Sequence, residues 1–235
     1  MLQKLLKYFG IFLLVIIAIC GILYGVYNEK LPQGKTGSEA DALAKKMLST
    51  LNYDKYKSTN YIEWSFQGGA NNYVWEKNKS IVTVSWDTIE VQLDLISTDS
   101  SMAYDNGIRI TGNEKEAVVE KALSYFHNDS FWLVAPYKVF DEGVTRSIVP
   151  LENGLSGLLV TYSKGGTTPG DSYLWILQPN GFPKSFKMWT TVLPIGGVKA
   201  TWDDWAIMES GAYLPKSHVM GPLELSLGAV KGYNK

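Results

Sequence analysis

The residues whose spacing most resembles a chemical motif lie in the stretch "GGTTPGDSYLWIL", residues 165–177. Gly165 and Gly170 are separated like the two glycines of a phosphate-binding loop, G-x-x-x-x-G-K-[ST]. Asp171 stands where that loop has a lysine, and a carboxylate there would repel a phosphate. The residues that follow alternate as in a strand, whereas a phosphate loop leads into a helix. We therefore interpret the stretch as a hairpin loop and predict no nucleotide ligand.

The other candidates for catalysis are few. The adjacent carboxylates of Asp203 and Asp204 suit acid–base or cation chemistry, but neighbouring residues on a strand point to opposite faces, which favours a turn or surface role. His127 and His218 show no metal-ligand spacing, and His127 is expected to satisfy carbonyls at a helix end. The sequence predicts no catalytic residue, no metal and no cofactor, and a hydrolase using Asp203 or Asp204 is the least favoured function.

Arg146 is one of two arginines, the other being Arg109, and it lies among apolar strand residues. A buried arginine needs a carboxylate partner. Asp141, five residues earlier, is the predicted partner in a structural ion pair, and Asp129 and Asp171 are alternatives.

Composition excludes several classes of protein. The 235 residues carry 22 basic and 23 acidic side chains, a net charge of −1 that gives no basis for nucleic-acid binding. The single cysteine, Cys20, excludes an intramolecular disulfide. The 46% hydrophobic content supports one sizeable core.

The first 27 residues predict a membrane anchor. Lys4 and Lys7 precede an uncharged apolar run, residues 8–27, which is long enough to cross a bilayer. We predict a cytoplasmic tail (1–7), a transmembrane helix (8–27), a linker (28–37) and a domain (38–235) in the periplasm, held at the inner membrane. A cleaved signal peptide is one alternative. Another is lipidation at Cys20 in "IAIC", although bulky Ile19 departs from a lipobox.

Periodicity in the domain predicts an α+β fold. Apolar residues recur at helical spacing in 38–53, capped by Ser38, and in 113–128, capped by Asn113. Alternation predicts strands and hairpins in 61–67, 72–86, 88–95 and 103–110, with turns at 76–79 and at Asn106-Gly107. Residues 129–143 are interpreted as a Trp/Phe-rich connector, and strands resume after it. We expect one curved antiparallel sheet, an incomplete β-barrel, with an N-terminal helix and an inserted helix.

Aromatic residues on both faces of these strands permit a hydrophobic cavity under the helices. The residues predicted to line it and bind a ligand are Trp64, Phe66, Tyr73, Trp75, Trp132, Trp175, Met188 and Trp189.

The order helix, strands, inserted helix, strands resembles the Lol-type lipoprotein carriers, over residue 38 to the C-terminus and in aromatic strands such as "NNYVWEKN". That resemblance implies a curved, incomplete barrel that holds acyl chains. "NDSFWL", "TRSIV" and "TPGDSYLWI" resemble segments of an uncharacterised family of bacterial envelope proteins.

Two functions follow as expectations. The first is a membrane-anchored, non-enzymatic protein that binds a membrane lipid or lipoprotein acyl chain in the cavity. The second is a tethered module without a cavity that recognises a protein or a glycan.

Overall fold

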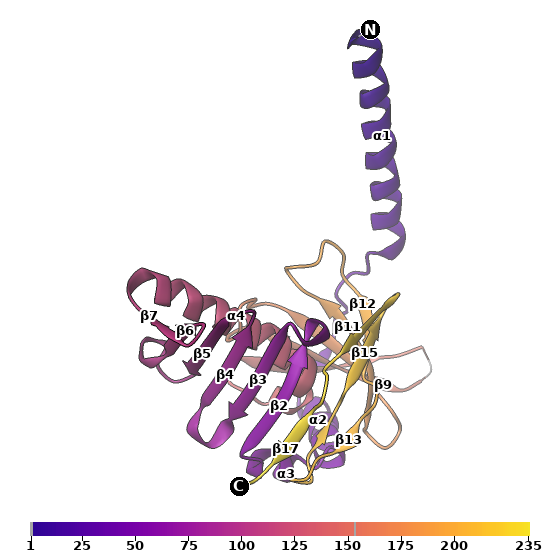
Figure 1. Cartoon of the computed structure of the whole chain (residues 1–235). Coiled ribbons are helices and arrows are strands. Elements are labelled where there is room, and N and C mark those ends of the chain that lie inside the picture. Colours follow the sequence, from indigo (N-terminus) through magenta and orange to yellow (C-terminus); the bar gives the residue numbers. More distant parts are fainter. Residues whose placement is uncertain (1, 153) are drawn as a thin grey trace.

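The computed structural model describes residues 2–152 and 154–235, without the side chains of residues 2, 3, 5–7, 20 and 23. Lipidation at Cys20 therefore concerns a side chain outside the described ones. Helix α1 (Leu2–Tyr27) projects from the domain (Figure 1). Its residues Tyr8–Tyr27 are long and apolar enough to cross a membrane, and no other helix in the described part of the chain is.

A seven-stranded antiparallel sheet forms the first half of the domain, in the order β17-β2-β3-β4-β5-β6-β7. Its strands are β2 (Tyr61–Phe66), β3 (Asn71–Glu76), β4 (Ile81–Trp86), β5 (Ile89–Asp94), β6 (Met102–Asp105), β7 (Ile108–Ile110) and β17 (Lys231–Tyr233). Burial alternates along β2 and β4, because one face of the sheet meets the core and the other meets solvent. The alternation seen in the sequence is therefore confirmed for these strands.

Short turns join these strands as predicted. The turn between β3 and β4 is the 3-10 helix η2 (Lys77–Lys79). Asn106 and Gly107 join β6 to β7 with φ values of 49° and 77°, the left-handed pair that a type I′ turn requires. Two further 3-10 turns are η1 (Gln67–Gly69) and η3 (Thr98–Ser100).

The second half of the domain holds a six-stranded antiparallel sheet in the order β1-β8-β9-β10-β11-β12, with two two-stranded ribbons. The sheet strands are β1 (Lys35–Thr36), β8 (Val144–Pro150), β9 (Ser156–Tyr162), β10 (Ser172–Leu177), β11 (Pro183–Trp189) and β12 (Val198–Thr201). The ribbons are β13 (Ala206–Ile207) with β14 (Tyr213–Leu214), and β15 (Ser217–Met220) with β16 (Leu223–Ser226). The α+β antiparallel class is confirmed, but the strands form two large sheets where one was predicted.

The phosphate-loop motif lies in the loop between β9 and β10, and the residues after it form strand β10. That location confirms the prediction of a hairpin loop followed by a strand.

Helices α2 (Ser38–Thr50) and α3 (Tyr53–Ser58) precede the first sheet. Ser38 was predicted as the cap of α2, but Gly37 occupies that position and no side chain caps the helix. Asn52 adopts a left-handed conformation between α2 and α3, so the predicted single helix to residue 53 breaks there.

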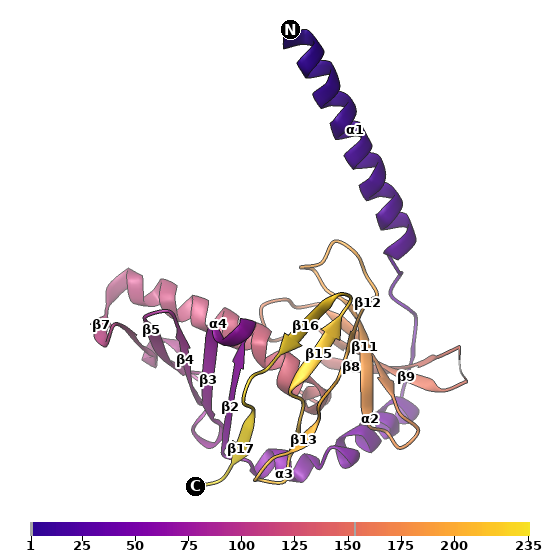
Figure 2. The same ribbon diagram turned by 45° about the vertical axis from the view of Figure 1, so that its right-hand side comes forward.

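The inserted helix α4 (Gly112–Val134) is longer than predicted, and Thr111 rather than Asn113 precedes it. The first six residues of the predicted connector, 129–134, are therefore part of α4, and η4 (Ala135–Lys138) follows. Figures 1 and 2 show α4 crossing one face of the seven-stranded sheet towards the other sheet. Phe126 packs against Trp64 and Trp75 of the first sheet, and Phe131 packs against Tyr173 of the second. One helix thus joins the two sheets in a single core.

The segment predicted as a linker, 28–37, contacts the domain near both of its ends. Asn28 and Glu29 hydrogen-bond to the loop between β11 and β12. Lys35 and Thr36 pair with β8 as strand β1. A Cβ on Gly34 would lie 2.7 Å from Cβ of Ser147, so only glycine allows this close approach. The linker boundaries stay a prediction, but these contacts hold the segment against the second sheet.

Candidate functional site

Five of the eight residues predicted to line a cavity are buried in the core, and three are half-buried. The buried residues are Trp64, Phe66, Tyr73, Trp175 and Met188. The half-buried ones are Trp75, Trp132 and Trp189.

These side chains pack against one another and against α4. The rings of Trp64 and Tyr73 are stacked with centroids 4.4 Å apart. Those of Trp175 and Phe186 lie 5.2 Å apart, and both residues are fully buried. Trp132 of α4 lies 6.4 Å from Phe66, which links the rings of the two sheets. A ligand-binding role for them stays a prediction, while their contacts are those of a packed core.

Trp189 lies apart from this core, in a small cluster with Leu159 and Leu174. Its indole Nε1 donates a 2.8 Å hydrogen bond to the carbonyl of Glu29. Trp189 therefore contacts the segment that leaves α1.

The predicted ion pair between Arg146 and Asp141 is wrong. Nε of Arg146 lies 2.7 Å from Oδ1 of Asp41, on α2, and Asp141 pairs with Lys138 on the surface. Nη1 of Arg146 donates to the carbonyls of Val139 and Val144, at 2.8 and 3.1 Å. The partner comes from a helix 105 residues away, so proximity along the chain misled the assignment. The pair joins α2 to the second sheet.

Substitutions at Arg146, Asp41 and Asp141 are expected to show which carboxylate pairs with Arg146. Arg146→Ala should lower the free energy of unfolding by about 1–3 kcal/mol, because two carbonyls and a carboxylate lose a charged donor. Asp41→Ala should cost less, and Asp141→Ala should stay within about 0.5 kcal/mol. Urea unfolding of the three variants measures the order. An Asp141→Ala cost equal to that of Arg146→Ala would contradict the observed pairing.

The remaining candidates for chemistry serve the structure. Asp203 accepts a hydrogen bond from Thr201, and Asp204 accepts one of 2.9 Å from Ser217. Each carboxylate thus has its own hydroxyl partner, as a turn or surface role predicts. Among the described residues, no group of three or more His, Cys, Asp or Glu is arranged to hold a metal ion.

The two histidines have different surroundings. His127 lies inside α4 rather than at its end, and Nδ1 of its ring has no hydrogen-bond partner among the described residues. His218 is fully buried, with Nδ1 2.7 Å from the carbonyl of Thr201 and Nε2 2.6 Å from that of Trp132. Burial lowers the pKa of His218, and the two carbonyls oppose that shift. His218 therefore ties α4 to β12 and β15.

A buried polar cluster on α4 was missed in the sequence. Asp129 is fully buried, and it accepts hydrogen bonds from Asn71 at 2.9 Å and from Tyr73. Asn128 donates to its second oxygen at 2.8 Å. Burial, followed by the nearby Asp129 carboxylate, raises the pKa of Tyr73, so its hydroxyl stays a donor. This cluster fastens α4 to β3.

Lys77 is the lysine whose pKa departs furthest from its ordinary value among the described residues. Its Nζ donates to the carbonyl of Tyr56 and lies 3.7 Å from the centroid of that ring. Burial, with a smaller contribution from the charge of Lys138, lowers the pKa of Lys77 to about 8. The ammonium thus has two partners within the fold, the carbonyl and the ring of Tyr56, and it joins η2 to α3.

The outer, solvent-facing side of the seven-stranded sheet carries polar side chains that are not part of the core. We define it by the solvent-side residues of β2–β6 together with Arg109 of β7 and Lys231 of β17. In cross-strand register, Ser65, Asn72, Ser85, Glu90, Tyr104 and Arg109 form one row. Lys231, Glu63, Val74, Thr83, Gln92 and Met102 form a second row.

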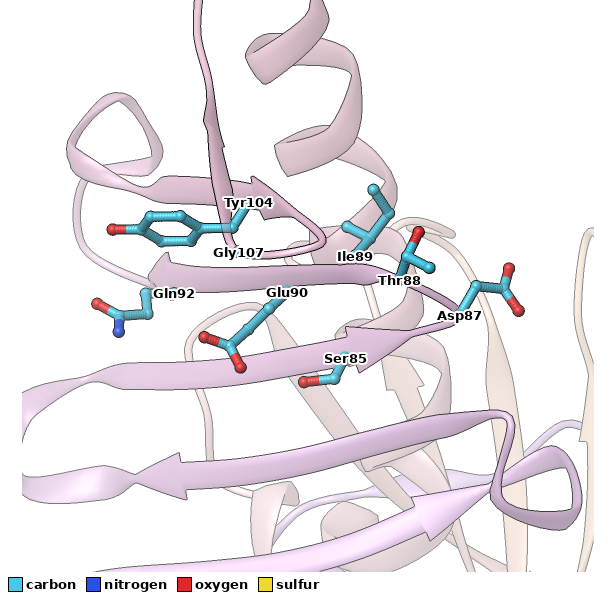
Figure 3. Close-up of a pocket in the computed structure, with 8 residues that line it drawn as sticks. All are labelled: Ser85, Asp87, Thr88, Ile89, Glu90, Gln92, Tyr104 and Gly107. Atoms are coloured by element: carbon cyan, nitrogen blue, oxygen red, sulfur yellow. The ribbon is translucent and has the colours of Figure 1, made fainter.

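Two depressions lie along this face. One, of about 470 Å³, crosses β4–β6. Figure 3 shows Glu90 and Gln92 on β5, with Tyr104 on β6 at one side of them and Ser85 on β4 at the other. The other, of about 270 Å³, crosses β17 and β2–β4. Ser85 lines both, so the depressions join into one surface.

Some polar groups on this surface are already paired, and others are not. Glu63 accepts hydrogen bonds from Lys231 at 2.7 Å and Tyr233 at 2.6 Å, and these bonds lower the pKa of Glu63. Glu90, Gln92 and Arg109 have no side-chain hydrogen bond or ion pair within the part of the chain that the structure describes. The unpaired groups offer an acceptor, an amide and a planar donor to a ligand.

Comparisons of the chain with protein families and with curated proteins found no relative. No protein-family model matches the chain, and no curated protein matches it. The likeness to the Lol-type carriers therefore stays a resemblance in element order.

Proposed function

We propose that the chain is a single-pass membrane protein whose folded domain binds a glycan, without catalysis, on the outer face of the seven-stranded sheet. In this proposal α1 crosses the inner membrane, and the basic residues Lys4 and Lys7 favour a cytoplasmic N-terminus and a periplasmic domain. The two sheets then act as an incomplete barrel around α4.

The observation that carries the proposal is a surface of polar side chains across two joined depressions, in which Glu90 and Gln92 of the larger depression have no side-chain partner among the described residues. A sugar hydroxyl both donates and accepts hydrogen bonds. It therefore suits a surface on which the acceptor Glu90 lies beside Ser85 and Gln92, whose side chains can donate or accept. The half-buried ring of Tyr104 offers a flat face to the C–H groups of a pyranose. A protein partner would be expected to find an apolar centre, and these rows hold mostly small and polar side chains, with Val74 and Met102 as their aliphatic members.

The charge arrangement argues against hydrolysis at this face. A glycosidase uses two carboxyl groups about 5–9.5 Å apart. Glu63 on β2 and Glu90 on β5 are separated by three strand spacings, about 14 Å. Asp87 lines the same depression as Glu90, but its carboxylate points away from that of Glu90 (Figure 3). Glu63 is also occupied by Lys231 and Tyr233. The face therefore suits binding.

Glycan binding is tested with the full chain in detergent on an array of neutral and acidic oligosaccharides. We expect retention of at least one class, weakened about tenfold or more by Glu90→Ala, because a hydrogen bond to a charged group is lost. Glu120→Ala, an exposed carboxylate on α4, is the matched control and should bind as the native chain does.

The acyl-chain alternative predicts a different result from the same protein. Native mass spectrometry would then show lipid that co-purifies, with no oligosaccharide retained and no effect of Glu90→Ala. That combination would replace the glycan proposal with a lipid carrier.

A further inference from the structure

The loop between β11 and β12, residues 190–197, has the sequence "TTVLPIGG" and carries no charge. Val192 at its tip is 70% exposed. Leu193 turns inward and packs against the core. An exposed aliphatic side chain on an uncharged loop finds no apolar neighbour in water, whereas a lipid surface supplies one.

Both ends of this loop are fixed. The amide of Thr191 donates a 3.0 Å hydrogen bond to Oδ1 of Asp171, and Asp171 is buried. The amide of Gly197 donates to the carbonyl of Met188 at 2.9 Å. The tip therefore projects in a direction set by the second sheet.

The loop is also bonded to the first residues after α1. Gly196 donates its amide to Oδ1 of Asn28 at 2.8 Å and accepts from the amide of Glu29 at 3.0 Å. A Cβ on Gly196 would lie 2.7 Å from the carbonyl oxygen of Glu29, so only glycine permits this approach. Lys187 adds an ion pair to Glu29 at 2.6 Å. The end of α1 and the base of the loop are thus one connected unit.

These contacts set the depth of the loop once α1 crosses a bilayer. The amide of Asn28 bonds to the carbonyl of Tyr24, so the helical path continues just past Tyr27. Asn28 adds about 1.5 Å of helical rise and Glu29, outside the helix, at most about 3.6 Å, so both lie within about 5 Å of the end of the span. The headgroup layer on each side of a bilayer is about 5–8 Å thick. Gly196 is bonded to both residues, so it lies at headgroup depth.

A second apolar tip lies on the same side of the domain. Figures 1 and 2 show the β15–β16 hairpin pointing towards the side from which α1 leaves, as the orange β11–β12 loop does. Leu223 directly follows the turn of that hairpin and is 54% exposed, and Val219, one residue before Met220 at the start of the turn, is 43% exposed. Two apolar tips beside one membrane-spanning helix favour a lipid surface as their common partner.

We infer that the tip of the β11–β12 loop, with Val192, inserts into the headgroup region of the bilayer that α1 crosses. The domain is then seated on the membrane in one orientation instead of moving freely on a linker. This inference rests on the membrane span in the proposed function and is independent of the ligand.

Two labelled positions test the insertion in the full chain. In a Cys20→Ser background, Val192→Cys and Ile207→Cys each receive an NBD fluorophore, and the protein is reconstituted into phosphatidylcholine vesicles. Ile207 is the matched control, because it is an aliphatic side chain 62% exposed on β13, at the end of the domain away from α1 (Figures 1 and 2). Both sites are exposed, so neither label should disturb folding.

We expect doxyl-labelled lipid to quench the label at 192 about twofold or more over the label at 207, with iodide showing the reverse order. Equal quenching of both labels by iodide, in protein that floats with the vesicles, would overturn the inference and leave the anchor standing. Protein that does not float with the vesicles would overturn both the inference and the anchor.

Discussion

Trp175→Ala is expected to lower the free energy of unfolding by about 3–5 kcal/mol, which is the cost of removing a large ring from a packed core. Trp175 is fully buried, and its ring lies 5.2 Å from that of Phe186 and 5.5 Å from that of Trp202. No neighbour is free to fill the space, because these rings also pack against one another. Urea unfolding followed by circular dichroism measures the loss.

The same substitution separates a filled core from a ligand cavity. In a cavity, Trp175 would already be exposed on one side, so its removal would change stability little and would weaken uptake of a fluorescent fatty acid instead. Ile207→Ala, at an exposed aliphatic side chain, is the control and should stay within about 0.5 kcal/mol. A loss of similar size in both variants would show that Trp175 is not packed as described.

Strand alternation predicted the first sheet well because solvent covers one of its faces. Along β2, Ile62, Trp64 and Phe66 turn inward and their neighbours turn outward, so local order and tertiary burial agree. The second sheet is harder to predict from sequence. Four consecutive residues of β10 from Ser172 are buried, so both of its faces are covered and alternation no longer tells inside from outside.

The end of α4 was misplaced because buried polar residues resemble a helix stop. Asn128, Asp129 and Ser130 follow an amphipathic stretch and have poor helix propensity. In the fold, Asp129 and Ser130 are buried, and the carboxylate bonds to a strand 58 residues earlier in the chain. Tertiary hydrogen bonds thus override local propensity, and no local pattern reports them.

The candidate site was missed for a related reason. Aromatic residues drew the prediction towards a cavity, whereas large rings most often fill cores. The polar members of the same strands, Glu90 and Gln92, were visible in the sequence as the opposite face. What the sequence does not show is that no helix of the described residues covers that face, which depends on how α4 packs.

The anchor and the sheet face impose separate requirements on one domain. Contacts from the end of α1 to the β11–β12 loop hold the second sheet against the end of that helix. The seven-stranded sheet is joined to it through α4, so in the proposed function its outer face would keep a defined position relative to the bilayer. To hold a ligand in a constant orientation, the connection through α4 would have to be rigid. The hydrogen bonds of buried Asp129 to β3 contribute to that rigidity.

Asp129→Ala is expected to lower the free energy of unfolding by about 3–5 kcal/mol, comparable to breaking a buried charged pair. The change removes the acceptor of two buried donors, the Asn71 amide and the Tyr73 hydroxyl. Both would be left without partners in a place that water does not reach, and this costs more than the bonds alone contribute. Urea unfolding at neutral pH measures the loss.

Two further variants make this expectation specific to the cluster. Asp129→Asn keeps one acceptor oxygen but turns an amide donor towards Asn128, so its cost should be smaller, about 1–3 kcal/mol. In a Tyr73→Phe background the orphaned hydroxyl is absent, so Asp129→Ala should cost less than it does in the native chain. Additive costs in that double-mutant cycle would show that Tyr73 and Asp129 are not coupled, and the hydrogen bond from Asn71 would then be the only contribution of β3 to this cluster.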